Sequence, residues 1–386
     1  MRALLAFDKF KDALPAADAC AVAAAALRSL RPDWELDLCP LTDGGEGFAT
    51  LLTQAADGKI HTITVTGPRG TPVRAGFGLV PPSRVPHAAR AQLALPAATP
   101  PYAPIALIEM ATASGLAHLP AAQRDPWQTT TFGTGELLRA AIAAGAAVIV
   151  LGVGGSATND LGLGALAALG WRFLSASHED VSPPVPGSWD RIVRLVSPPV
   201  AALPPIRIAC DVANPLLGPH GCAAVYGPQK GLRPEDLAKL EQTSARLALL
   251  LCTRAGVRDE IMDTPGAGAA GGIAFGLMTA AGATLLPGFD FVSAWLDLDR
   301  RIAAADVVLT GEGRFDASSL AGKGPAAVAA RARALGRPAH IFAGAVGTGV
   351  PPTSYAVHAI TPAGTPLATA LSATAANLAA AVRRTF

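Results

Sequence analysis

The sequence has few cysteines, and none in a metal-binding or disulfide arrangement. Its 386 residues include five cysteines, which are scattered singly and show no Cys-x-x-Cys spacing. This pattern excludes the common zinc frameworks and a disulfide scaffold. We therefore expect reduced thiols that serve as packing residues.

Charge is also scarce. Asp, Glu, Lys and Arg make up 16% of the residues, and the formal net charge is +2 with both signs interspersed. Without a basic stripe, neither nucleic acid nor an acidic membrane surface is expected as a partner. Asp8 and Lys9 come too early for the apolar core of a signal peptide, which predicts a cytoplasmic protein.

Long hydrophobic runs suited to a membrane are missing as well. Residues 140–159 and 264–289 carry no charge and approach the length of a bilayer-spanning helix. The first run breaks into an alanine helix, a strand and a glycine loop. The second is rich in glycine and contains Pro265 and Pro287, which makes it a poor lipid-facing helix. We expect no membrane span.

The sequence does contain a regular alternation of short apolar runs with helical patterns. Buried strands are predicted at residues 3–7, 35–41, 105–110, 146–151, 206–210, 307–310 and 340–343. This alternation predicts an α/β fold with parallel strands, and the chain length favours two domains. Ligands of such sheets bind at the carboxyl ends of strands, so polar turns at those ends are candidate site residues.

The most informative turn lies within residues 148–170, where a strand pattern runs through a glycine loop into a helix. Gly154 and Gly155 let backbone N–H groups approach an anion, and the helix N-terminus favours negative charge. Ser156, Thr158 and Asn159 add side-chain donors, and Asp160 could cap the helix or face a metal. The alternative is a strand-to-helix turn that needs glycine only for tight packing.

Carboxylates and cations follow other predicted strands. Phosphoryl transfer needs such groups to hold magnesium, position the attacking hydroxyl and neutralise the transferring charge. An ordinary turn or a solvated surface remains the alternative for each group, and Lys9, Lys11 and Lys230 individually resemble surface lysines. The candidates are Asp43 and Glu46, Asp211, the alternating Glu312, Arg314 and Asp316, and Lys323.

Two other nucleotide-binding patterns bear on the function of the glycine-rich segments. The Walker pattern is absent, because Lys323 is followed by Gly324 and no glycine stands at the required earlier position. Gly152, Gly154 and Ala157 fit the relaxed dinucleotide pattern, which keeps a nicotinamide-dependent hydroxy-acid dehydrogenase open, although no acid follows at the expected distance. A non-catalytic metabolite sensor also stays open.

The ordered set of turns closely resembles the bacterial glycerate kinase family, over nearly the whole chain. The resemblance is carried by DKFK at 8–11, TDGGEG at 42–47, IEMATASGL at 108–116, TTTFGTGEL at 129–137, GGSATND at 154–160, ACDV at 209–212, NPL at 214–216, GP at 218–219, GPQKG at 227–231, GAGAAGG at 266–272 and TGEGRFD at 310–316. Departures are Asp12, Leu161 and Phe315.

The resemblance implies transfer of the γ-phosphoryl group of ATP to D-glycerate with Mg²⁺, 2-phosphoglycerate being favoured over 3-phosphoglycerate. It also implies two α/β domains with the active site in the cleft between them. A Rossmann-like domain is formed by both chain termini, expected at residues 1–65 plus 289–386, and a second α/β domain is inserted at residues 66–288. A monomer or a homodimer is expected.

Residue roles follow from the same resemblance. Asp211 is expected to position or deprotonate the glycerate hydroxyl, and Lys11, Arg314 and Lys323 to bind the glycerate carboxylate or the transferring phosphoryl. Nucleotide phosphates are assigned to Gly154, Gly155, Ser156, Thr158, Asn159 and Asp160, substrate contacts to Asp8, Asn214, Gly268 and Gly271, and magnesium to Asp43, Glu46, Glu312 and Asp316.

Overall fold

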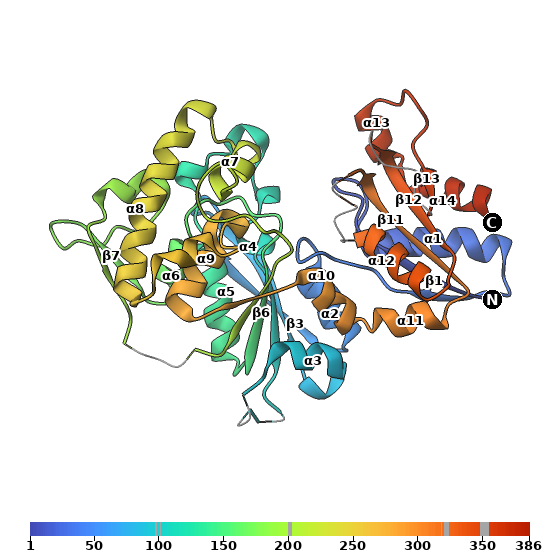
Figure 1. Cartoon of the computed structure of the whole chain (residues 1–386), viewed down its shortest axis with the longest axis horizontal. Helices are drawn as coiled ribbons and strands as arrows, with labels where there is room; N and C mark the ends of the chain where they lie inside the picture. Colours follow the sequence, from blue (N-terminus) through green and yellow to red (C-terminus); the bar gives the residue numbers. More distant parts are fainter. Residues whose placement is uncertain (97–98, 101, 200–202, 318, 320–323, 348–354) are drawn as a thin grey trace. The chain divides into compact units, whose positions relative to one another are not determined.

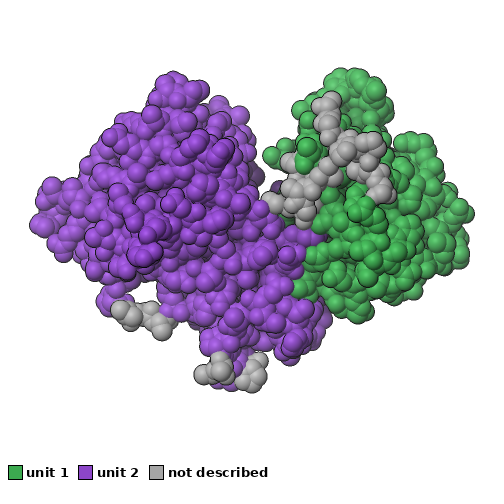
Figure 2. All heavy atoms as spheres, viewed as in Figure 1, with its two compact units in different colours: residues 1–43, 292–386 green, residues 44–291 purple. Residues whose placement is uncertain are grey.

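The computed structural model describes the chain except residues 97–98, 101, 200–202, 318, 320–323 and 348–354 (Figure 1). It divides into two compact units, residues 1–43 with 292–386 (unit 1) and residues 44–291 (unit 2) (Figure 2). Both chain termini belong to unit 1. The predicted site residue Lys323 lies outside the described residues.

Unit 1 is built on a parallel sheet with the strand order β13-β12-β11-β1-β2. The strands are β1 (Arg2–Phe7), β2 (Glu35–Leu38), β11 (Val307–Phe315), β12 (Ala339–Val346) and β13 (Ala356–Ala359). β1 pairs with β11 in a register that sets Phe7 opposite Gly311. Because β1 and β11 are parallel neighbours, the residues that follow β1 lie beside the second half of β11.

Helices cover both faces of the unit 1 sheet (Figure 1). α1 (Ala16–Leu30) and α14 (Thr374–Thr385) pack on Leu5, Phe7 and Leu309 of one face. α12 (Gly324–Ala334) packs on Ile341 and Ala343 of the other. The remaining helices are α11 (Leu298–Ala304), α13 (Leu367–Ser372) and α10 (Gly288–Trp295), which crosses a unit boundary.

Unit 2 contains a mixed sheet with the order β10-β9-β6-β5-β4-β3. An antiparallel hairpin, β3 (Lys59–Thr66) and β4 (Pro72–Val80), joins the parallel strands β5 (Ile105–Glu109), β6 (Val148–Gly152), β9 (Ile206–Ala209) and β10 (Thr284–Leu286). Every residue of β5 and β6 is buried, as expected for central strands covered on both faces.

Most helices of unit 2 lie on the side of the sheet that holds its large core. These are α4 (Ala111–Ser114), α5 (Phe132–Ala143), α6 (Leu163–Ala168), α7 (Cys222–Tyr226), α8 (Leu237–Ala255) and α9 (Ala269–Ala281); α2 (Phe48–Ala55) and α3 (His87–Leu93) complete the unit, with a small sheet of β7 (Arg172–Leu174) and β8 (Arg194–Val196). In the part of the chain that is described, no helix is both long enough and apolar enough to cross a bilayer.

The predicted α/β fold with parallel strands is confirmed, and the predicted strands recur with small shifts. The strand predicted at 35–41 is assigned only to Leu38, although Cys39 and Leu41 still donate to Leu5 and Phe7 carbonyls; Pro40 between them has no N–H. The first unit boundary is predicted at 65/66 and lies at 43/44 in the structure. It lies earlier because α2 packs on β4 and β5 and because β3 pairs with β4, which places α2 and β3 in unit 2. The second falls at 291/292, against a predicted 288/289.

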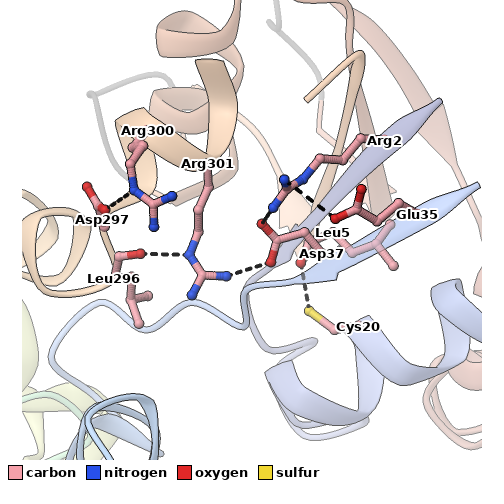
Figure 3. A network of polar contacts seen from close by, with 9 residues as sticks. All are labelled: Arg2, Leu5, Cys20, Glu35, Asp37, Leu296, Asp297, Arg300 and Arg301. Atoms are coloured by element: carbon pink, nitrogen blue, oxygen red, sulfur yellow. Dashed lines mark hydrogen bonds and ion pairs between the residues drawn. The ribbon is translucent and has the colours of Figure 1, made fainter. Parts of the chain in front are cut away.

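A polar network fixes β1, β2 and α11 within unit 1 (Figure 3). The Asp37 carboxylate accepts from Arg2 Nη2 at 3.1 Å and from Arg301 Nη1 at 2.6 Å. Arg301 also donates from Nε to the Leu296 carbonyl at 2.9 Å. The Asp37 side chain is only 14% exposed, so its two ion pairs are partly shielded from water.

Asp37→Asn should lower the free energy of unfolding by about 2 kcal/mol, because two partly buried guanidinium groups lose their counter-charge. Asp57→Asn is the control, since the Asp57–Arg84 pair is 78% and 55% exposed and should contribute less than about 1 kcal/mol. Chemical denaturation followed by circular dichroism measures both. Equal effects of the two changes would contradict this assignment.

Candidate active site

The loop that connects β6 to α6, residues 153–162, reaches the protein surface only at its tip; it is hereafter the glycine loop. Gly155 is exposed, Gly154 is half-buried and Ser156 is 8% exposed. Thr158, Asn159 and Asp160 are completely buried. Of the six residues assigned to nucleotide phosphates, Gly155 is therefore exposed, Gly154 is half-buried and the other four are buried.

The loop tip presents unused backbone donors. Gly155 has φ of +73°, a conformation that glycine adopts without steric cost. Among the described residues, no acceptor takes the backbone N–H of Gly155 or Ser156, whereas the Gly155 carbonyl accepts from Leu116 N at 2.8 Å. Two adjacent N–H groups without an acceptor, one of them on the exposed Gly155, are suited to phosphate oxygens.

Asp160 acts inside the protein rather than at its surface. Its Oδ2 accepts from the Thr131 backbone N–H at 2.7 Å, the Thr131 hydroxyl at 2.8 Å and Gly164 N at 3.2 Å; its Oδ1 accepts from Gly162 N at 3.2 Å. Burial raises the pKa of this carboxyl, and the four hydrogen bonds oppose that rise. The structure thus uses Asp160 to join the start of α6 to the segment before α5, in the manner of a cap.

Close packing explains part of the glycine pattern. A Cβ on Gly154 would lie 2.5 Å from Gly45 Cα, and Gly154 N donates to the Gly44 carbonyl at 3.0 Å. Behind the loop, Gly271 has φ of +74°, and a Cβ there would lie 2.0 Å from the Thr158 carbonyl oxygen. The Gly-x-Gly spacing therefore has a packing cause and does not by itself indicate a dinucleotide.

Leu161, where the resemblance leads us to expect glycine, adopts φ of +56°. Its side chain is fully buried, and its N–H donates to the Gly271 carbonyl at 3.0 Å. The left-handed conformation costs a branched residue about 1 kcal/mol, and burial of the leucine side chain offsets that cost.

The structure excludes the alternative that Lys230 is an ordinary surface lysine. Lys230 is 1% exposed, and its Nζ donates to the Thr158 carbonyl at 2.6 Å and lies 3.5 Å from Asn159 Oδ1. Burial lowers the pKa of its ammonium group to about 8. The one indication of burial in the sequence was the position of Lys230 between Gly227 and Gly231. The structure shows why Gly231 is needed: its φ is +93°, and a Cβ there would lie 2.2 Å from the Arg124 carbonyl oxygen.

Asp211 and Asn214 follow β9 in unit 2. Asp211 Oδ2 accepts from Phe289 N, in the first turn of α10, at 2.9 Å. Asn214 accepts from the Tyr226 hydroxyl at 2.7 Å and donates to the His220 carbonyl at 2.8 Å. The Asn214 backbone carbonyl accepts from Gly266 N and Gly268 N, so the segment that contains Gly268 packs against Asn214.

Unit 1 gathers carboxylates after β1 and within the second half of β11. Asp8 follows β1, Glu312 lies in β11, and Asp8 N donates to the Gly311 carbonyl at 3.0 Å. Burial and then the charge of Asp43 raise the pKa of Asp8 to about 7. Burial, followed by the charges of Asp316 and Asp43, raises the pKa of Glu312 to about 7, against a hydrogen bond from Ser319. Asp8, Asp43 and Glu312 form the carboxylate cluster.

The carboxylate cluster has the chemistry of a divalent-cation site. Glu312 Oε1 is buried with no hydrogen-bond partner in the described part of the chain, and the cluster concentrates negative charge. Hard oxygen donors of this kind suit Mg²⁺. Across the described residues, however, no three His, Cys, Asp or Glu side chains stand as a ready-made ligand set.

The other predicted cation and anion groups are placed differently. Arg314 Nε donates to Asp316 Oδ2 at 3.0 Å in an exposed ion pair, and Lys9 Nζ lies 3.5 Å from Asp43 Oδ1. Lys11 is exposed. Glu46 is exposed and belongs to unit 2, whereas the carboxylate cluster belongs to unit 1.

Comparison with known proteins gives consistent matches over the whole chain. The family model described as "Glycerate kinase family" matches residues 3–386. The chain is 38% identical to a glycerate kinase of Bacillus subtilis (strain 168), over 90% of this chain and 85% of that protein. It is 34% identical to a glycerate 2-kinase of Escherichia coli (strain K12), over 90% and 86%.

A solved structure from Salmonella typhimurium LT2, assigned as a glycerate kinase 2, superposes with a TM-score of 0.78 at 35% identity. The superposition covers 100% of this chain and 97% of that one.

Gly271→Ala should displace the glycine loop, because the new Cβ would collide with the Thr158 carbonyl at a position with φ of +74°. We expect a loss of more than about 2 kcal/mol in the free energy of unfolding and at least about a tenfold loss in ATP affinity. Gly282→Ala is the matched control: φ is +63°, nothing lies within 4 Å, and only a strain of about 1 kcal/mol is expected. Denaturation and calorimetry measure both; unchanged ATP affinity in Gly271→Ala would contradict the role of this contact.

Proposed function

This chain belongs to the glycerate kinase family, and we propose that it transfers the γ-phosphoryl group of ATP to the 2-hydroxyl of D-glycerate, giving 2-phosphoglycerate and ADP. The observation that carries the proposal is the family match over residues 3–386, which includes the glycine loop and the carboxylate cluster. Similarity to a glycerate 2-kinase of E. coli favours the 2-hydroxyl over the 3-hydroxyl. We place the enzyme in the cytoplasm, as a monomer or homodimer.

In this proposal the glycine loop holds the nucleotide phosphates. The N–H groups of Gly155 and Ser156 are the accessible donors, and the Ser156 hydroxyl adds a third. Thr158, Asn159 and Asp160 act from beneath by fixing the backbone. Preformed donors of this kind stabilise the charge of the transferring group without reorganising during the reaction.

The carboxylate cluster would hold Mg²⁺. Glu312, Asp43 and Asp8 supply the oxygen ligands, with Asp316 and Glu46 as further candidates. A bound Mg²⁺ neutralises phosphate charge as the phosphoryl group is transferred. Holding a cation also relieves the repulsion that raises the pKa values of Asp8 and Glu312.

Asp211 is proposed to position or deprotonate the attacking hydroxyl of glycerate, with Asn214, Gly268 and Gly271 shaping the segment around it. The substrate carboxylate and the transferring phosphoryl need cationic partners. Arg314 and the exposed Lys11 of unit 1 are the described candidates, and Lys323 completes the proposed set.

The reaction is tested by mixing the pure chain with ATP, MgCl₂ and D-glycerate and identifying the product by phosphorus NMR. We expect a 2-phosphoglycerate signal that requires glycerate and is lost with chelator. A 3-phosphoglycerate signal would correct the site of attack. ADP release without any phosphorylated acid would contradict the proposed acceptor.

Asp211→Asn should lower kcat by about 10²-fold or more, because an amide cannot take the hydroxyl proton. The amide keeps an oxygen to accept from Phe289 N, so folding should be preserved. Asp190→Asn, at an exposed position of the same unit, is the control. Near-normal turnover of Asp211→Asn in a coupled ADP assay would remove Asp211 from catalysis.

The carboxylate cluster also predicts how stability depends on pH. Asp8 and Glu312 have pKa values of about 7 in the folded protein and ordinary values of 3.8 and 4.5, so the folded state binds more protons between these limits. Stability should therefore fall as pH rises from about 4.5 to 7 and stay low above it.

Glu312→Gln should reduce that fall, stabilise the protein at pH 8 and abolish the rise in melting temperature that Mg²⁺ gives the wild type. Thermal melts at pH 5 and pH 8, with and without Mg²⁺, measure this. An equal Mg²⁺ response in the variant would exclude Glu312 as a ligand.

A further inference from the structure

We propose that Lys230 is a positioning residue that holds the glycine loop in its phosphate-binding conformation and supplies buried positive charge behind it. The inference rests on the proposed function, since it takes the loop to bind the phosphates of ATP. Lys230 contacts the loop but not its exposed tip.

The first support is the contact itself. Lys230 Nζ donates to the Thr158 carbonyl at 2.6 Å and is 3.5 Å from Asn159 Oδ1, both within the glycine loop. A carbonyl that accepts from an ammonium group with 1% exposure must face the interior. The Thr158 oxygen, which would repel a phosphate, is thereby kept away from the surface.

The second support is the lack of an ion pair. A buried ammonium group is costly unless it is paired. In the described part of the chain no carboxylate lies within ion-pair distance of Lys230. The charge of the buried Asp160 carboxylate does act on Lys230, but that carboxylate already accepts four hydrogen bonds. Burial raises the pKa of the neighbouring Cys222 thiol to about 11, so it carries no charge near neutral pH.

A buried cation that has no ion pair favours an anion on the loop above it. Thr158 and Asn159, which Lys230 contacts, lie two and three residues after Ser156. The Thr158 hydroxyl is also buried without a partner in the described residues, so the loop is not fully satisfied by the protein alone. The buried positive charge becomes favourable when a phosphate binds at Gly155 and Ser156.

A purely structural lysine would instead only stabilise the fold. Lys230→Met keeps the aliphatic length and removes the charge, and Lys230→Arg keeps the charge. Lys239→Met is the control, because Lys239 is exposed and lies over the Trp127 ring of the same unit. Calorimetry with ATP and with adenosine, in the full chain, separates phosphate binding from base binding.

We expect Lys230→Met to weaken ATP binding at least about tenfold, with adenosine affinity and the control unchanged, and Lys230→Arg to restore most of the loss. In turnover assays the effect should fall mainly on KM for ATP. Wild-type ATP affinity in Lys230→Met, or an equal loss for ATP and adenosine, would overturn the proposal.

The pH profile gives a second readout, which does not need Lys230→Met to fold. Cys222 and Asp160 are the titratable groups that act on Lys230, and Glu241 acts on Cys222. Wild-type ATP affinity should decline as pH rises through about 8, where the ammonium loses its proton, and Lys230→Arg should not show this decline. Cys222→Ala should keep it. Identical profiles for wild type and Lys230→Arg would overturn the proposal.

These outcomes are distinct from a failure of the proposed function. If the wild type binds ATP but transfers no phosphoryl group to glycerate, the acceptor is wrong and the Lys230 comparison still decides the role of the lysine. If the wild type binds no ATP, both proposals fail.

Discussion

Backbone packs directly on backbone around residues 152–162, and the candidate phosphate site depends on that contact. Gly154 lies against Gly45, and Gly271 lies against the Thr158 carbonyl, each at a distance that leaves no room for a Cβ. These contacts fix the path of the glycine loop, while Asp160 joins it to the segment before α5. At the tip, the N–H groups of the exposed Gly155 and of Ser156 have no acceptor among the described residues. A loop clamped in this way can hold donors ready for an anion before the anion arrives.

Each unit contains titratable groups whose pKa values are shifted by burial. Unit 1 gathers Asp8, Asp43 and Glu312, and burial with mutual repulsion raises the pKa values of Asp8 and Glu312 to about 7. Unit 2 buries Lys230 against the glycine loop, which lowers the pKa of its ammonium group to about 8. Both arrangements reduce stability without a ligand, because charged groups are desolvated without full compensation. In the proposed function, the opposite charges of a bound cation and a bound phosphate would remove that cost.

The sequence predicted the strands well because central parallel strands such as β5 and β6 are continuous apolar runs. It also located Asp8 and the glycine loop directly after strands, where the α/β fold brings polar turns together. The turn predicted at Glu312 is wrong, because β11 continues to Phe315 through its pairing with β12. It could not reveal the burial of Lys230, since a lysine becomes buried only through contacts with residues distant in sequence, here Thr158 and Asn159. The inward role of Asp160 and the packing of α2 with the second unit likewise depend on tertiary contacts that local patterns do not encode.

The most direct test of this account is a crystal structure of the chain with Mg²⁺ and a non-hydrolysable ATP analogue. The account predicts phosphate oxygens within about 3.2 Å of the backbone nitrogens of Gly155 and Ser156, with Lys230 still bound to the Thr158 carbonyl and Mg²⁺ on carboxylates of the Asp8, Asp43 and Glu312 cluster. Phosphates bound without contact to residues 154–156, or a Lys230 side chain withdrawn from the loop, would contradict it.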